Sequence, residues 1–138
     1  MSMPDDIILN KVATIERCLQ RIVEEYYQHE DELETNYTRQ DSIVLNLLRA
    51  CESSIDLAMH CVRTGKLGIP QDSRNAFDLL EQARIIDGAV SIKLKAMVGF
   101  RNIAVHNYQK LAIPVLRAIL EKNLEDFTAY TKAILSHR

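Results

Sequence analysis

The sequence predicts an all-α fold, an antiparallel helical bundle of about five helices in a single domain. Apolar residues recur every three or four positions along most of the chain, which is the period of an amphipathic helix. No segment alternates between apolar and polar residues as a strand would, and only 4 glycines and 3 prolines occur in 138 residues. A chain of this length can bury one hydrophobic core, so we expect one domain over residues 1–138.

The first expected helix begins near Pro4 and runs to about Tyr27. Proline fits the first turn of a helix, and the carboxylates of Asp5 and Asp6 suit the positive end of the helix dipole. A charged run follows over residues 29–34. Such runs are usually solvated helix ends or loops, so we interpret this one in that way rather than as a metal site.

A second, longer helix is expected from Thr38 to about Thr64, because Thr38 and Asp41 resemble a capping box. Most of its circumference is apolar, which indicates that it is covered on more than one side. Its polar residues alternate at steps of four and three and form one narrow polar stripe: Ser42, Asn46, Arg49, Ser53, Asp56, His60 and Arg63. Two interpretations stay open, namely that the polar stripe lines a cleft or that it is simply the solvent-facing side.

Three further helices are expected after a break at residues 65–70, where glycine and proline end the second helix. Ser73 is a suitable cap for a short third helix. The fourth helix starts near Ala89 and continues past residue 104. Pro114 fits the first turn of a fifth helix, whose apolar repeat extends nearly to the C-terminus.

The charge balance argues against a general attraction to nucleic acid. The formal net charge is −2, so any contact with RNA or DNA must rest on a local patch. The cations available for such a patch are Lys93, Lys95, Arg49, Arg63 and Lys110. The N-terminus is acidic and does not resemble a signal peptide, and no apolar run approaches the length of a membrane span, so we expect a cytoplasmic protein that does not enter a membrane.

The cysteines favour a reduced, metal-free protein. Cys51 and Cys61 lie ten residues apart on one expected helix, which separates them by about 15 Å, too far for a disulfide. Together with Cys18 they form an odd set without a CxxC spacing, and no His-x3-His pair is present. We therefore expect neither a bound metal nor another cofactor.

One short stretch, residues 101–108, gathers three chemically useful side chains. Arg101 can hold a phosphate bidentately, His106 can move a proton near neutral pH, and Tyr108 offers a stacking face and a hydroxyl that can be modified. With no metal-binding spacing in the chain, attack by a ribose 2′-hydroxyl on its own phosphodiester is favoured over two-metal hydrolysis. The alternative is that the arginine and histidine only satisfy carboxylates and carbonyls near a helix end.

Helical phase separates the two catalytic candidates. Arg101 lies about 140° around a regular helix from His106, with a rise of about 7.5 Å. The arginine stem could turn inward, the helix could loosen near His106, or a second subunit could supply the missing group. Partial burial of Arg101 would require a carboxylate partner, for which Asp56 and Glu52 are the candidates. Gly99, on the stripe of His106, predicts a close approach to the helix backbone.

The run MVGFRNIAVHNY from Met97 to Tyr108 resembles the signature of the HepT-type toxins of the HEPN superfamily, whose pattern is Arg-x4-His-x-Tyr. Residues 48–60 of the second helix, followed by Gly68-Ile69-Pro70, are also similar to this family. The resemblance therefore covers nearly the whole chain.

The resemblance implies a HEPN-like helical bundle that forms a two-fold homodimer, with its cleft at the dimer interface and the motif contributed by both subunits. It implies the toxin of a type VII HEPN/MNT system, a metal-independent endoribonuclease with RNA as substrate and with Arg101 and His106 as catalytic residues. It also implies a partner, a minimal nucleotidyltransferase antitoxin (MntA), which neutralises the toxin by transferring AMP to Tyr108. The residues expected to support the cleft are Asn102, Lys95, Arg49, Ser53, Asp56 and His60.

Two other functions stay open at this point. The first is a non-catalytic HEPN module that binds nucleotide or RNA beside a minimal nucleotidyltransferase without cutting it. The second is a purely structural helical dimer. Cleavage of RNA that is lost in His106→Ala would favour the nuclease, whereas binding without cleavage would favour the module.

Overall fold

The computed structural model describes residues 5–137, and all of its regular elements are helices. The α-helices are α1 (Asp6–Tyr26), α2 (Tyr37–Thr64), α3 (Ser73–Gln82), α4 (Gly88–His106), α5 (Ile113–Lys122) and α6 (Leu124–His137). Two single turns of 3-10 helix, η1 (Glu30–Glu32) and η2 (Tyr108–Lys110), lie in the connections. The predicted all-α fold is confirmed. None of the described helices is both long and apolar enough to cross a membrane.

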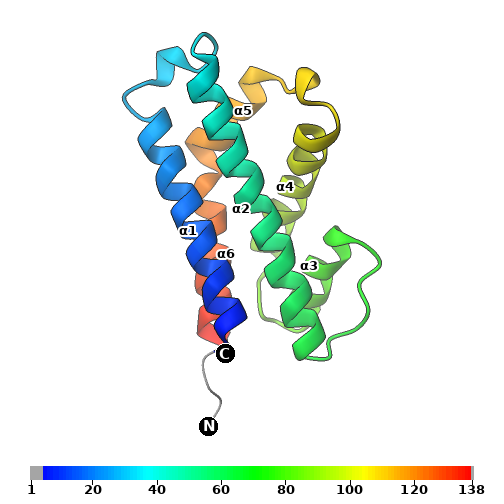
Figure 1. Cartoon of the computed structure of the whole chain (residues 1–138). Coiled ribbons are helices and arrows are strands. Elements are labelled where there is room, and N and C mark those ends of the chain that lie inside the picture. The colour runs from blue at the N-terminus through cyan, green and yellow to red at the C-terminus, as the bar shows by residue number, and fades with distance from the viewer. Residues whose placement is uncertain (1–4, 138) are drawn as a thin grey trace.

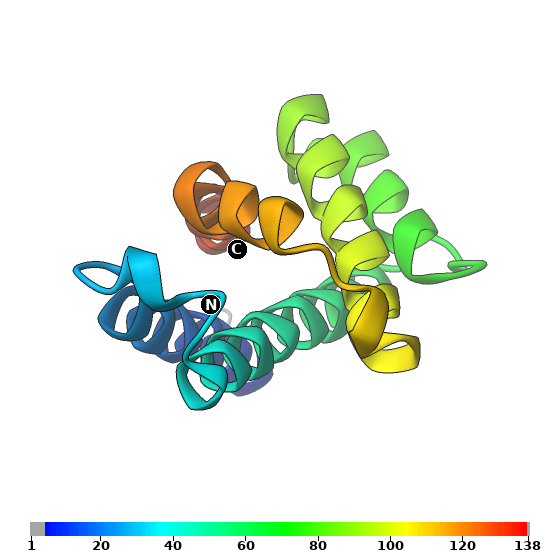
Figure 2. The same cartoon turned by 90° about the horizontal axis from the view of Figure 1, so that it is seen from above.

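The long helix α2 is the centre of the bundle, because it contacts α1, α3 and α4. Figure 1 shows α1 beside α2 at the front, α6 behind them, and α3 and α4 on the other side of α2. Seen from above in Figure 2, α5 crosses between the α1–α2 pair and the α3–α4 pair. A hydrogen bond from Tyr108 to Asp41 ties the turn η2, which follows α4, to the first turns of α2.

The core is filled by side chains from every layer. Tyr26, Phe77, Phe127 and Tyr130 are fully buried, together with isoleucines and leucines of α1, α2, α3 and α4. The Tyr130 hydroxyl donates a hydrogen bond to the Ser54 carbonyl oxygen at 2.8 Å, which satisfies a polar atom that would otherwise destabilise the core. The ring of Tyr130 packs edge-on against Phe77, with centroids 5.7 Å apart. Helices α2, α3 and α6 are joined at this point.

The three cysteines are free thiols, and Cys18 and Cys51 are buried. Burial raises the pKa of Cys51 to about 12 and that of Cys61 to about 11. Both thiols are therefore protonated at neutral pH and behave as small apolar side chains.

The first turn of α2 differs from the expected capping box. Asn36 caps the helix, and its side chain accepts a hydrogen bond from the Arg39 backbone N–H at 3.0 Å. Thr38 lies inside the helix, so the capping box predicted for Thr38 and Asp41 is wrong, and the Asp41 side chain bonds Tyr108 instead. For α1, Asp5 is the cap, whereas the predicted role of Pro4 lies outside the described residues.

The C-terminal segment is two helices rather than the predicted single one. Helix α5 ends at Lys122, where Asn123 donates its backbone N–H to the Ile119 carbonyl, and its side chain bonds the Asp126 carboxylate at 3.0 Å. The apolar repeat continues through this break, since Leu120, Leu124 and Phe127 all pack inward. A periodicity argument cannot detect a break of this kind.

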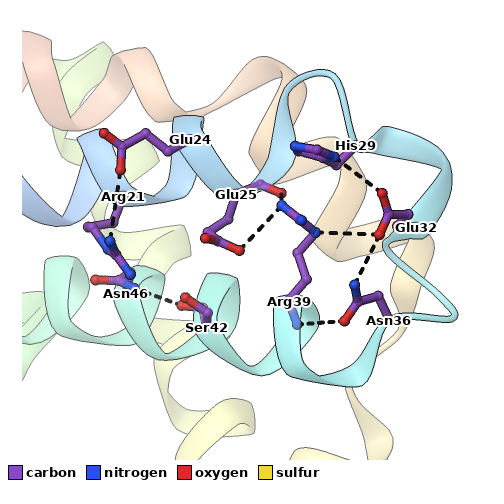
Figure 3. Close-up of polar contacts among 9 residues, drawn as sticks. All are labelled: Arg21, Glu24, Glu25, His29, Glu32, Asn36, Arg39, Ser42 and Asn46. Atoms are coloured by element: carbon purple, nitrogen blue, oxygen red, sulfur yellow. Dashed lines mark hydrogen bonds and ion pairs between the residues drawn. The ribbon is translucent and has the colours of Figure 1, made fainter.

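The connection between α1 and α2 is held by Arg39, as Figure 3 shows. Its guanidinium donates to the Glu25 carbonyl at 2.9 Å and lies 3.4 Å from the Glu25 carboxylate and 3.6 Å from that of Glu32. Glu32 also contacts His29 and Asn36. The charged run predicted as a loop or helix end is thus the turn η1 and its flanks, fastened to both long helices.

Candidate functional site

The three motif side chains leave the end of α4 in different directions. Arg101 lies inside the helix, His106 is its last residue, and Tyr108 belongs to the following turn η2. Helix α4 is regular from Arg101 to His106 and ends after the histidine, so a loosening of the helix does not bring the two side chains together within the chain. The end of the helix directs Tyr108 back toward the start of α2.

Arg101 is anchored between two helices. Its Nη2 lies 3.7 Å from the Glu52 carboxylate on α2, and its Nη1 donates to the Asn102 side-chain oxygen at 3.1 Å. Glu52 was one of the two carboxylates predicted as partner, and this pairing is confirmed. A guanidinium has five N–H donors, so these contacts leave several of them unused. One of them, the buried Nε, has no hydrogen-bond partner.

Tyr108 is tied to α2 by a second acid. Its hydroxyl donates to the Asp41 carboxylate at 2.7 Å. Partial burial, and next the bond to this carboxylate, raise the pKa of Tyr108 to about 12. The hydroxyl is therefore protonated at physiological pH. The residue remains 39% exposed and lines a cavity of about 540 Å³ together with Tyr37.

The two acids show how α2 supports the motif. Asp41 and Glu52 lie eleven residues apart, about 16 Å along the helix, on one face reached in steps of four, three and four. Leu45 lies between them and is 44% exposed. Val105, one turn after Arg101 on α4, is 45% exposed, and His106 beside it is also exposed. We call Leu45 and Val105, with the motif between them, the motif face.

The stripe of Lys95 and Gly99 faces α3. Lys95 forms an ion pair with Asp78 on α3 at 2.7 Å. At Gly99, an added Cβ would lie 3.2 Å from Nη2 of Arg74, so the predicted close approach is confirmed and the approaching group is an α3 side chain. Of the residues expected to support the cleft, only Asn102 forms a hydrogen bond or ion pair with a motif side chain among the described residues.

The polar stripe of α2 faces α1 rather than Arg101. Asp56 lies 3.3 Å from Lys11, and buried His60 lies 2.6 Å from Asp5. Ser53 is buried. Arg49 lines a groove between α1 and α2, described below. The polar stripe was interpreted either as the lining of a cleft or as a solvent-facing side. Its N-terminal part lines the groove, as the first interpretation predicts, whereas its C-terminal part packs against the first turns of α1.

Asp41 is the site residue whose role the sequence concealed. A Thr-x-x-Asp spacing at the start of a helix predicts a capping box, so the local sequence indicates a different role for Asp41. Its partner Tyr108 is 67 residues away in sequence, and no local pattern connects them. Glu52 could be identified as a candidate because a partly buried Arg101 requires a carboxylate partner.

Comparison with known proteins places these features in a family. Residues 12–134 match the family described as Ribonuclease HepT-like. The chain is 46% identical to mRNA nuclease HepT of Shewanella oneidensis over 130 residues, which cover 94% of this chain and 97% of the relative.

Two solved structures are similar over nearly their whole length. The tri-AMPylated Shewanella oneidensis HEPN toxin in complex with MNT antitoxin is 45% identical, with a TM-score of 0.90 and coverage of 96% of this chain and 98% of the other. A toxin–antitoxin crystal structure with AMP-PNP is 45% identical, with a TM-score of 0.91 and coverage of 96% and 99%.

Proposed function

The chain belongs to the ribonuclease HepT-like family and is the toxin nuclease of a HEPN/MNT toxin–antitoxin pair, and we propose that Arg101 and His106 carry out its reaction. The supporting observation is the state of Arg101. Glu52 and Asn102 fix its guanidinium at the side of the motif face and leave N–H donors unused. A fixed cation with free donors is suited to the charge that develops on a phosphate.

The reaction is a transfer within the RNA backbone. The ribose 2′-oxygen attacks the adjacent phosphorus, the bond from phosphorus to the 5′-oxygen breaks, and the products carry a 2′,3′-cyclic phosphate and a 5′-hydroxyl. One proton leaves the 2′-hydroxyl and one reaches the 5′-oxygen. His106, which is exposed at the helix end, is suited to move these protons, a role typically worth about 10²- to 10⁴-fold in rate.

A second copy of the chain completes the site in this proposal. Arg101 is drawn toward α2, whereas His106 projects from the end of α4 without a hydrogen-bond partner among the described residues. The motif face carries the half-exposed apolar side chains Leu45 and Val105, which a homodimer would bury. Two such faces related by a two-fold axis would bring both motifs into one cleft.

Tyr108 is the proposed acceptor of AMP from a nucleotidyltransferase antitoxin, in keeping with the AMPylated relative. The tyrosine oxygen attacks the α-phosphorus of ATP, the bond to the β-phosphate oxygen breaks, and pyrophosphate leaves. The hydroxyl proton passes to Asp41, which already accepts its hydrogen bond. The added nucleotide places an anion two residues from His106, where it would exclude the substrate phosphate.

RNA cleavage in the presence of a chelator tests the proposed reaction. The purified wild-type protein should cleave single-stranded RNA and leave cyclic phosphate ends, and both Arg101→Ala and His106→Ala should lose at least about 10²-fold in rate. Lys132→Ala, on exposed α6, is the control and should cleave as the wild type does. Binding of RNA by the wild type with no cleavage would instead favour the non-catalytic binding module.

A further inference from the structure

A groove of about 560 Å³ runs between α1 and α2 and is lined by three arginines. Arg17 and Arg21 extend from α1, and Arg49 from α2. All three are exposed. Figure 3 shows Arg21 extending toward α2, where Asn46 lies on the groove wall. We call this feature the arginine groove.

The charge of the arginine groove is largely uncompensated. Arg17 and Arg49 form no ion pair among the described residues, and Arg21 lies 3.9 Å from an exposed Glu24, a contact of little energetic weight. Asp41 is the one carboxylate on the groove wall, against three guanidinium groups. A net positive groove thus exists in a chain whose formal net charge is −2.

The groove is continuous with the motif through Asp41. This residue lines the arginine groove on one side and the cavity of Tyr108 on the other, and it bonds the Tyr108 hydroxyl. A strand whose scissile phosphate lies at the motif can therefore continue past Asp41 and along α2 toward Arg49.

We propose that the arginine groove binds backbone phosphates of the RNA strand next to the cleaved bond. Guanidinium groups match phosphate oxygens bidentately, and the side chains of Ser42 and Asn46 add neutral hydrogen-bonding groups to the wall. No aromatic ring lines the groove, so it offers nothing on which a base could stack. The groove is accordingly expected to bind the phosphate backbone of RNA without preference for its base sequence. This inference rests on the proposed nuclease function and names how its substrate is held.

Binding of RNA as a function of salt tests the groove separately from cleavage. The binding measurements use full-length protein carrying His106→Ala, so that the RNA stays intact, and a labelled single-stranded RNA or DNA of equal length. Adding Arg17→Ala and Arg49→Ala should weaken binding of both nucleic acids on the order of tenfold and lower the slope of log K against log salt by about 1.4. With His106 restored, KM for RNA should rise on the same order, while kcat at saturating RNA stays near the wild-type value.

A matched control removes the same charge elsewhere. Arg84→Ala with Lys132→Ala takes two cations from the α3–α6 side and should leave the salt slope and KM unchanged. Light scattering should give the same oligomeric state for all variants, which excludes an effect through assembly.

Three outcomes would overturn the inference. An unchanged salt slope and KM in the Arg17 and Arg49 variant would show that the groove does not hold RNA. An equal loss in the control would reduce the effect to net charge. Retained RNA binding with loss of the antitoxin complex would assign the groove to a protein partner. Absence of cleavage by the wild type would instead contradict the proposed function, and the binding data would still decide the groove.

Discussion

The exposure of the Tyr108 hydroxyl favours its modification, whereas its raised pKa opposes it. The hydroxyl is accessible enough to react, yet burial and the adjacent Asp41 raise its pKa to about 12, so it attacks only if its proton is removed. The same carboxylate that raises the pKa lies 2.7 Å from the hydroxyl and can take the proton. Asp41 would then be the general base for the transfer of AMP to Tyr108, supplied by the toxin itself and not by the antitoxin.

The change Asp41→Asn separates these effects. Burial, the largest cause of the raised pKa of Tyr108, stays in place, but removing the carboxylate should still lower this pKa below about 12, because the hydrogen bond and the negative charge both favour the protonated phenol. AMP incorporation by the cognate nucleotidyltransferase should nevertheless slow by on the order of 10²-fold, since the general base is gone. Absorbance titration against Tyr108→Phe gives the pKa, and labelled ATP gives the rate.

Two residues of the same cavity serve as controls. Glu34→Gln removes another carboxylate from the cavity, and Tyr37→Phe removes its other, more exposed phenol. Both variants should accept AMP at the wild-type rate. Faster incorporation in Asp41→Asn would show that the raised pKa, and not proton removal, limits the reaction.

At the level of elements, the start of α1 is fastened to the far end of α2. Asp5 caps α1 by accepting hydrogen bonds from the backbone N–H groups of Ile7 and Ile8. Its other oxygen lies 2.6 Å from Nε2 of buried His60, whose Nδ1 contacts Arg63 at 3.2 Å. The hydrogen bond from His60, more than the backbone contacts, lowers the pKa of Asp5.

This contact predicts a pH-dependent stability. A carboxylate with a lowered pKa stabilises the fold above its ordinary pKa of 3.8, and the stabilisation is lost as the pH falls through the lower value of the folded state. Asparagine also caps helices well, so Asp5→Asn should keep the cap and lose only the charge. Chemical unfolding at a series of pH values should show the wild type losing its advantage over Asp5→Asn below about pH 4. Parallel pH profiles of the two proteins would contradict the assignment.

The helices could largely be predicted, because each buries an apolar stripe of helical period. The break between α5 and α6 at Asn123 could not be predicted, because the apolar stripe continues through it and only the local backbone conformation changes. The candidates for the ion-pair partner of Arg101 could be limited to two acidic residues, because a half-buried cation needs a nearby negative charge. The bond from Tyr108 to Asp41, and the meeting of Arg17 with Arg49, depend on packing between helices and leave no local trace.

At the scale of the whole molecule, two exposed apolar surfaces that include residues of α4 can be compared among the described residues, and the proposed dimer uses one of them. The motif face carries Leu45 and Val105. The other surface is a cavity of about 460 Å³ between α4 and α5, lined by Phe100, Ile103 and Val115 among others. Most of its lining side chains are apolar, and neither Arg101 nor Tyr108 lines it.

A charge placed on each surface distinguishes them. Val105→Glu should convert the dimer to a monomer in light scattering and abolish RNA cleavage, because a buried unpaired carboxylate is not tolerated at an interface. Val115→Glu, at a similarly exposed position, should remain a dimer and keep cleaving RNA. The opposite pattern would place the dimer on the α4–α5 surface.

The bond between Tyr108 and Asp41 also acts as a mechanical fastener. Among the described side chains of residues 107–112, it is the one hydrogen bond to another part of the fold. A phosphodiester on the tyrosine oxygen removes the donated proton, and its charge repels the carboxylate. Adenylation would therefore release the connection between α4 and α5 as well as block the cleft, and faster amide hydrogen exchange over residues 107–112 would report the modified state without any measurement of RNA.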